Sequence, residues 1–297
     1  FALGRLSPRR QPGLILAGSA AGVAAAFNTP LAGIVFGIEE MSRAFETRTS
    51  SLIIATVIAA GLTSLAWMGN YTYFGTTPIA LGKGIDWLAV PVCGVIGGAM
   101  GGLFSRILIT MARGFTHPAG RAIKRHPLSF AIACGLAVAI CGLVSGDTIY
   151  GTGYAQVKAA LESGTPLPND FGILKFLATT FAAISGIPGG IFAPSLAVGA
   201  GIGANVASFF QQTPLAPIML LGMVAYFAGV VQAPITAFVI VTEMTDNHAM
   251  VVPLMMASLI AYATSRLVCE EGLYHALAKG FVAKAEQPAD DGLRRVG

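Results

Sequence analysis

Charged residues are scarce in this chain of 297 residues. Asp, Glu, Lys and Arg make up 11% of it, and hydrophobic residues make up 55%, which gives a mean hydropathy of +0.72. An ordinary soluble domain carries about 25% charged residues. So few charges cannot cover the surface of the soluble domains for which the chain is long enough. The composition therefore excludes an ordinary water-soluble protein and predicts an integral membrane protein.

The sequence also lacks the usual signatures of metal, redox and catalytic sites. Its four cysteines form no CxxC pair, and no pair of its four histidines has metal-ligand spacing. No nucleophile-elbow, zinc-protease, Walker or dinucleotide motif occurs. We therefore expect no metal, no cofactor and no enzymatic activity. The net charge of +4 is small, so we attribute it to membrane topology and expect no nucleic-acid partner.

Stretches without any charged residue or histidine organise the chain. A membrane-spanning helix needs about 20 apolar residues, so the longest stretch, residues 176–242, must hold two or three membrane segments. Prolines such as Pro30, Pro188, Pro194 and Pro234 interrupt these stretches, which predicts broken and tilted helices. The stretches are residues 11–38, 49–82, 87–105, 127–146 and 176–242, followed by a shorter apolar segment at 249–265.

The distribution of Lys and Arg predicts the orientation in the membrane. Arg43 and Arg48 form one basic zone, and five basic residues between positions 106 and 125 form a second. The loop between the zones, near residues 67–87, is rich in aromatic residues. We place both basic zones and the tail 279–297 in the cytoplasm and the aromatic loop outside. The segments 51–68 and 88–112 then cross the cell membrane outward and back.

An internal repeat relates residues that lie 204 positions apart. NTPLAGIVFGIEEM (28–41) matches QAPITAFVIVTEMT (232–245), which pairs Pro30 with Pro234 and Glu39 with Glu243. The repetition predicts a two-fold transporter architecture, although it does not show whether the copies are inverted. Paired acids suggest a structural role at a helix end for Glu39 and Glu243. Glu40 has no acidic counterpart, so the repeat does not require it.

Three stretches together resemble the chloride channel (CLC) family: residues 18–41, GGIFAP within residues 186–203, and residues 232–247. The resemblance continues through GLYHALA at 272–278. It implies an all-α, multi-span integral membrane fold with broken and tilted helices in an inverted repeat. The implied divisions are residues 1–48 as the end of the first repeat half, 49–278 as the second half with the anion-site helix, and 279–297 as a short cytoplasmic tail.

The motif GGIFAP suits an anion site on physical grounds. Two glycines permit a sharp turn and close approach of the backbone to a ligand. A helix that begins near Ile191 offers unpaired N–H groups and the positive end of its dipole to an anion. The resemblance implies that Gly190, Ile191 and Phe192 bind the anion through this backbone, and that the hydroxyl of Tyr274 points at the same ion.

Glu40 falls on the family's internal proton-transfer glutamate, where channel members usually carry an apolar residue. Burial near the membrane interior disfavours the charged form of a carboxyl, which favours proton loading near neutral pH. The leading interpretation is chloride/proton antiport. The alternative is a passive, voltage- or pH-gated chloride channel, and a more distant one is a membrane-embedded enzyme.

The resemblance also implies that the protein forms homodimers and that part of the first repeat half is missing from this sequence. Family members are homodimers in the lipid bilayer, and the implied interface includes Ile38 and Val251. Shifting GGIFAP by the repeat offset places its first-half partner, which bears the family's gating glutamate, upstream of Phe1. We therefore expect the N-terminal part of the first half to be missing from this chain, and residues 1–297 not to transport by themselves. Chloride and protons are the expected partners.

Overall fold

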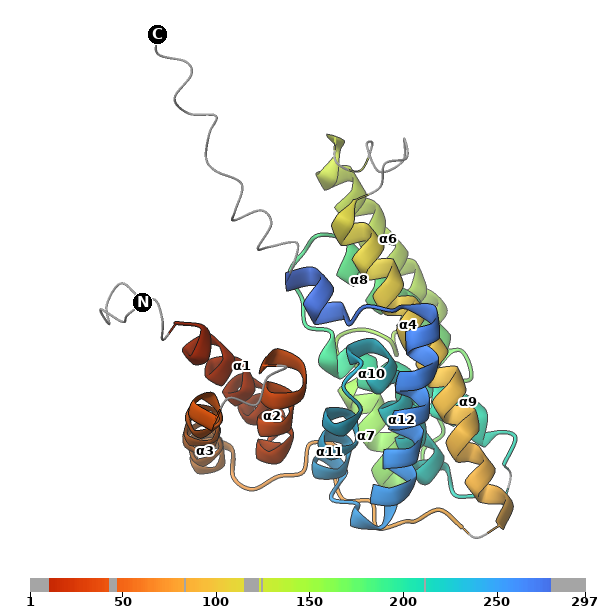
Figure 1. The fold of residues 1–297 in the computed structure, drawn as a ribbon. Coiled ribbons are helices and arrows are strands. Elements are labelled where there is room, and N and C mark those ends of the chain that lie inside the picture. Colours follow the sequence, from red (N-terminus) through yellow and green to blue (C-terminus); the bar gives the residue numbers. More distant parts are fainter. Residues whose placement is uncertain are drawn as a thin grey trace.

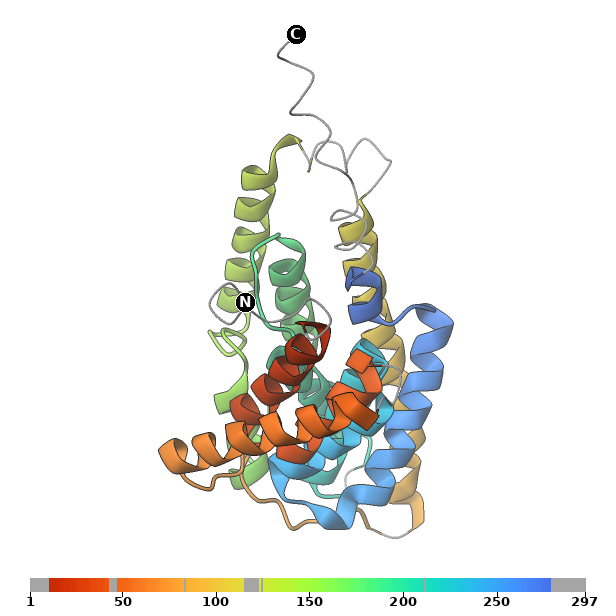
Figure 2. The same cartoon turned by 60° about the vertical axis from the view of Figure 1, so that its left-hand side comes forward.

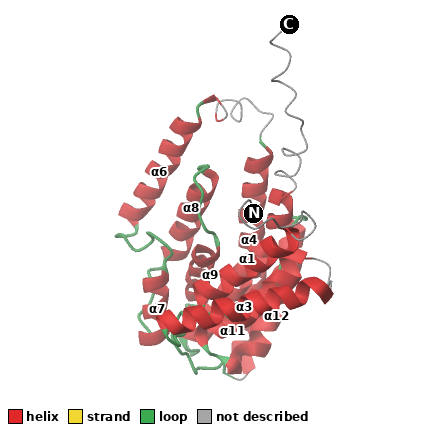
Figure 3. Cartoon of the chain, turned by 90° about the vertical axis from the view of Figure 1, so that its left-hand side faces the viewer, coloured by secondary structure: helices red, strands yellow, loops and turns green. Residues whose placement is uncertain are grey.

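A computed structural model of the chain describes residues 11–42, 47–82, 84–114, 123, 125–210 and 212–278. Arg43, Arg121, Lys124 and the tail 279–297, on which the predicted orientation partly rests, lie outside these residues. The described part is helical, without strands (Figure 3). Its elements are α1 (Gln11–Phe27), α2 (Pro30–Phe36), the π-helix η2 (Gly37–Ser42), α3 (Thr47–Met68), η3 (Gly84–Leu88), α4 (Ala89–Arg113), α6 (Pro127–Val144), α7 (Tyr154–Ser163), α8 (Phe171–Ile184), α9 (Phe192–Ala207), α10 (Leu215–Val231), α11 (Pro234–Thr245), η4 (His248–Met250) and α12 (Val251–Val268), and residues 273–278 are helical as well.

Four helices are long and apolar enough to cross a membrane: Ser51–Met68, Gly84–Arg113, Pro127–Val144 and His248–Val268. The first two coincide with the segments predicted to cross the membrane. The stretch 176–242 holds the end of α8, all of α9 and α10, and most of α11, each shorter than 18 residues. The predicted broken helices are therefore present, because Gly and Pro divide this apolar stretch before any single helix reaches spanning length.

Helix α10 is the centre of the helical bundle, with α4, α9 and α12 packed around it (Figure 1). Nearly every one of its residues is buried. Small residues allow this close packing, since a Cβ on Gly199 or Gly203 of α9 would lie 2.5 Å from a backbone oxygen of α10. Such contacts between backbones are the way in which helices associate where the surrounding solvent is itself apolar.

The outer helices present apolar side chains outward. Only 11% of the α3 span and 17% of the α6 span is buried within the chain, and Ile58, Leu62, Leu136 and Leu143 are each more than half exposed. An apolar surface of this extent suits contact with lipid and is uncommon on a protein in water. Helices α1, α2 and α3 form a separate layer beside the bundle (Figures 1 and 2).

The two copies of the repeat share their backbone geometry. Asn28 and Gln232 both adopt positive φ values, 54° and 58°, in the turns before α2 and α11. Pro30 and Pro234 then occupy the first helical position in each copy, where proline costs no hydrogen bond. The sequence repeat is therefore a structural one.

Helices α2 and α11 exchange equivalent hydrogen bonds. The Glu243 carboxylate accepts the backbone N–H groups of Leu31 and Ala32 at 3.0 and 2.7 Å. The Glu39 carboxylate accepts those of Ile235 and Thr236 at 3.0 and 2.6 Å. The end of each copy thus caps the start of the other, so the copies run antiparallel around a local two-fold axis, as an inverted repeat requires. The structural role predicted for this pair of acids is confirmed.

Candidate functional site

Helix α9 begins where the sequence predicts an anion site. Ile191 is its N-cap, and the first bond within the helix runs from the Ser195 N–H to the Ile191 carbonyl at 3.0 Å. The N–H groups of the first turn have no acceptor within a helix. A Cβ on Gly189 or Gly190 would meet no atom within 4 Å. The backbone before α9 therefore borders open space into which an anion can approach.

Aromatic side chains gather at the start of α9. The Phe192 ring lies 4.8 Å from Phe227, 5.3 Å from Phe36, 6.1 Å from Phe27 and 6.2 Å from Tyr274, measured between ring centroids. Tyr274 is also 5.9 Å from Phe36. Phe27 and Phe36 belong to the first repeat half, and the others follow it. The predicted anion residues Phe192 and Tyr274 thus share one aromatic cluster with Phe27 and Phe36, which are distant in the sequence.

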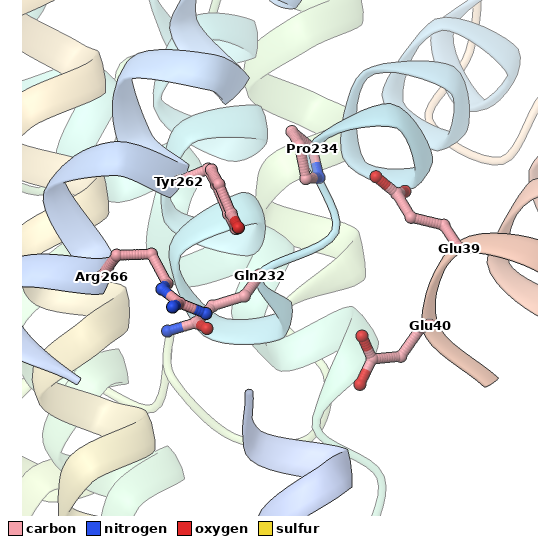
Figure 4. A pocket seen from close by; sticks show the side chains of 6 residues that line it. All are labelled: Glu39, Glu40, Gln232, Pro234, Tyr262 and Arg266. Carbon is pink, nitrogen blue, oxygen red and sulfur yellow. The ribbon is translucent and has the colours of Figure 1, made fainter. Parts of the chain in front are cut away.

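The two adjacent acids of the π-helix η2 point in different directions. Glu39 is turned toward the start of α11, whereas Glu40 extends into the space between η2 and α12 (Figure 4). The Glu40 side chain is 7% exposed, and its charge acts on the Tyr274 hydroxyl. The structure therefore brings the candidate proton-transfer residue into electrostatic reach of the candidate anion-binding tyrosine. π-Helical turns are frequent at functional sites.

A cavity of about 350 Å³ lies beside Glu40 (Figure 4). This volume holds several water molecules, since each occupies about 30 Å³ in the liquid. Residues from both repeat copies and from α12 line the cavity. Its lining residues are Glu39, Glu40, Gln232, Pro234, Tyr262 and Arg266.

The comparison with protein families is decisive. A family model described as "Voltage gated chloride channel" matches residues 1–266. The chain belongs to the voltage-gated chloride channel family. With this membership and four helices able to span a membrane, it is a multi-pass membrane protein.

Curated relatives within the voltage-gated chloride channel family are proton/chloride exchangers by name. The H(+)/Cl(-) exchange transporter ClcA of Yersinia pestis bv. Antiqua (strain Angola) is 34% identical over 304 residues, which cover 95% of this chain and 60% of the relative. The ClcA protein of Cronobacter sakazakii is 33% identical over 290 residues, with coverage of 92% and 60%. The chain therefore spans about 60% of the length of these relatives.

Solved structures of this family have the same fold. A slow cyanobacterial Cl−/H+ antiporter superposes with a TM-score of 0.71 at 26% identity, covering 94% of this chain and 67% of the other. A CLC-type fluoride/proton antiporter gives a TM-score of 0.76 at 24% identity, covering 91% and 66%. The likeness to the fluoride antiporter concerns the fold alone.

The predicted family residues do not all lie together. Ile191, Phe192 and Tyr274 lie together at the start of α9, and Glu40 acts electrostatically on Tyr274 from η2. Val251 lies at the start of α12. Sequence reasoning missed the cavity and three residues that line it, one in the turn before α11 and two on α12. These are Gln232, Tyr262 and Arg266. The one available signal was the isolated cation Arg266 in an otherwise apolar stretch.

Proposed function

We propose that this chain carries the anion-binding helix and the internal proton-transfer residue of a chloride/proton exchanger. The observation that carries the proposal is that Tyr274 lies beside Phe192 at the α9 N-terminus and within electrostatic reach of Glu40. The names of the relatives support the choice of ions. Chloride is then a transported ligand, and the proposal requires no cofactor.

In this proposal, the N–H groups of Ile191 and Phe192 hold chloride, and Gly190 leaves room for it. The Tyr274 hydroxyl supplies a further donor. The site uses partial charges from the helix dipole instead of a Lys or Arg side chain. Such binding is weak enough to let the ion leave, which transport requires as much as binding.

Glu40 carries the proton in this proposal. Its carboxyl lines the cavity, which gives protons a hydrated route to it, and its charge is felt at Tyr274. Protonation of Glu40 is therefore coupled electrostatically to the anion site. A passive channel would need the anion site but would have no use for this acid, so proton movement distinguishes the two functions.

The proposal includes the assembly of the exchanger. Two copies meet in the lipid bilayer, and Ile38 and Val251 lie in their interface. Support comes from exposed apolar side chains on helices near both residues: Leu31 on α2, Ile235 on α11 and Leu259 on α12 are 50–61% exposed. Residues 1–48 and 49–278 contribute to the two repeat halves, and 279–297 form a cytoplasmic tail.

Flux measurements in liposomes test the exchange function. In the full-length protein, a chloride gradient should drive protons uphill in the opposite direction. Glu40→Gln should keep chloride flux but lose proton flux, because the amide cannot carry a proton. Glu270→Gln, which removes an exposed acid beyond the end of α12, is the matched control and should leave both fluxes unchanged. Undiminished proton flux in Glu40→Gln would refute the role of Glu40.

A further inference from the structure

Arg266 is the one permanent positive charge among the six residues that line the cavity. It projects from α12 toward the cavity, on the wall that faces η2 and Glu40 (Figure 4). Tyr262 lies one helical turn earlier on the same face of α12, as the spacing of four residues dictates. A guanidinium stays charged at every pH at which a protein works. The cavity beside the candidate proton-transfer acid therefore carries a fixed cation.

Hydrogen bonds hold the backbone of Arg266 in place. The neighbouring Ser265 is fully buried, and its Oγ donates to the Gly229 carbonyl of α10 at 2.6 Å. The Gln232 amide donates to Ser265 Oγ at 3.3 Å and to the Cys269 carbonyl at 2.6 Å. The last turn of α12 is thus tied to α10 and to the turn before α11. This attachment fixes the position from which the Arg266 side chain reaches into the cavity.

No acid neutralises Arg266 within the described residues. Glu271, the nearby acid past the end of α12, pairs with Arg113 instead. The Glu39 carboxylate on the opposite wall is occupied by the N–H groups of α11. Arg266 lies in the final turn of α12, and no described carboxylate forms an ion pair with it. Its charge is therefore left to act across the cavity.

Several ionisable groups among the described residues lie near Glu40 or on elements that pack against η2. Glu39 lies on η2 itself, Tyr262 and Arg266 lie on α12, and Tyr274 lies in the helical residues 273–278. Helix α1, which packs against η2, has no ionisable residue, and Glu243 on α11 bonds to the start of α2. Among these described groups, the positive charge belongs to Arg266.

We propose that Arg266 is a positioning residue for proton transfer: its fixed charge favours the carboxylate form of Glu40, so that Glu40 releases its proton into the cavity. This proposal rests on the proposed role of Glu40. Burial alone favours the protonated carboxyl, and an acid that held its proton could not complete the exchange cycle. Arg266 opposes this tendency without touching the transported anion.

The pH dependence of proton flux tests the proposal in the full-length protein in liposomes. A fixed chloride gradient drives the flux while the pH on the cavity side is varied. In Arg266→Gln, Glu40 keeps its proton to higher pH, so the midpoint should rise by about 0.3 to 1 pH unit, as expected for one charge acting across a partly hydrated space. Arg266→Lys, which retains the charge, should remain near the wild-type midpoint.

Two controls make the result specific. Arg106→Gln removes an exposed cation of α4 that does not line the cavity and should leave the midpoint in place. In the Glu40→Gln background, Arg266→Gln should change neither chloride flux nor its pH dependence. An equal shift in Arg106→Gln or Arg266→Lys overturns the proposal, as does an unchanged midpoint in Arg266→Gln. Proton flux that persists in Glu40→Gln would instead overturn the proposed function itself.

Screening provides a test that does not depend on the folding of a variant. Raising a non-transported salt on the cavity side from about 10 mM to about 1 M shortens the Debye length from about 30 Å to about 3 Å. The wild-type midpoint should then rise in the same direction as in Arg266→Gln. A wild-type midpoint that does not respond to salt contradicts an electrostatic action of Arg266.

Discussion

Removing the Glu243 carboxylate should destabilise the fold, because this side chain caps the N-terminus of helix α2 in the other repeat copy. It accepts two backbone N–H groups, from Leu31 at 3.0 Å and from Ala32 at 2.7 Å. These donors lie in the first turn of α2, which has no acceptor of its own for them. Glu243→Ala therefore leaves two donors without their acceptor.

The expected magnitude follows from these two bonds. A hydrogen bond to a charged group contributes about 1.5–3 kcal/mol, and a negative charge at a helix N-terminus adds about 0.3–1 kcal/mol. Leu31 is 61% exposed, so the backbone there can relax and recover part of the loss. We expect Glu243→Ala to lower the free energy of unfolding by about 2–4 kcal/mol. Glu39→Ala should cost a similar amount, because its bonds at the start of α11 have nearly the same lengths.

Equilibrium unfolding in detergent, followed by circular dichroism, measures this loss. Glu243→Gln keeps the size of the side chain but presents an amide N–H₂ to a backbone donor, so it should lose at least half as much stability as Glu243→Ala. The exposed Glu270 supplies the control, and Glu270→Ala should stay within about 0.5 kcal/mol of the wild type. The double variant of Glu39 and Glu243 should lose less than the sum of the single losses, because both caps hold the same pair of helices together.

The reasoning would be refuted by a Glu243→Ala protein within 0.5 kcal/mol of the wild type. Strict additivity in the double variant would have a narrower meaning. It would show that the two caps act independently and that α2 and α11 are held together by other contacts.

Three further predictions concern the anion site, the assembly and the core. Tyr274→Phe should weaken chloride binding roughly three- to tenfold in calorimetric titration, because it removes one hydroxyl donor worth about 1 kcal/mol but keeps the ring; wild-type affinity would contradict the role of the hydroxyl. Trp at both Ile38 and Val251 should yield monomers in size-exclusion chromatography, and a surviving dimer would refute their placement in the interface. Gly222→Ala should lower the free energy of unfolding by about 1–3 kcal/mol, since its Cβ would lie 2.5 Å from the Gly203 nitrogen; Gly135→Ala, at a position where a Cβ meets no atom within 4 Å, should not.

The capping acids were predictable from the sequence because their signal is local and occurs twice. Proline at the first helical position and an acid nine residues later recur in both copies, and this repetition identifies Glu39 and Glu243 as a structural pair. The start of α9 was predictable for a similar reason. Gly189, Gly190 and Pro194 mark a turn and a helix start within a few residues.

The cavity was not predictable in this way, because its walls come from distant parts of the chain. Glu40 and Arg266 are more than 200 residues apart, and no local pattern states that α12 passes opposite η2. The π-helical turn that carries Glu39 and Glu40 left no sequence signal either. The sequence of an ordinary apolar α-helix that ends in two acids would look the same. Both features depend on tertiary packing, which periodicity and turn residues do not specify.

The exchange of caps between α2 and α11 has a consequence for biosynthesis. The start of α2 finds its acceptor only when Glu243 has been made, about 200 residues later. At a synthesis rate of about 5–20 residues per second, the first copy waits roughly 10–40 seconds with exposed donors at the start of α2. Neither copy can complete its own helix start while the ribosome still holds the second. Final closure of this fold is therefore a late event, and the membrane insertion machinery must hold the early helices in an open arrangement until then.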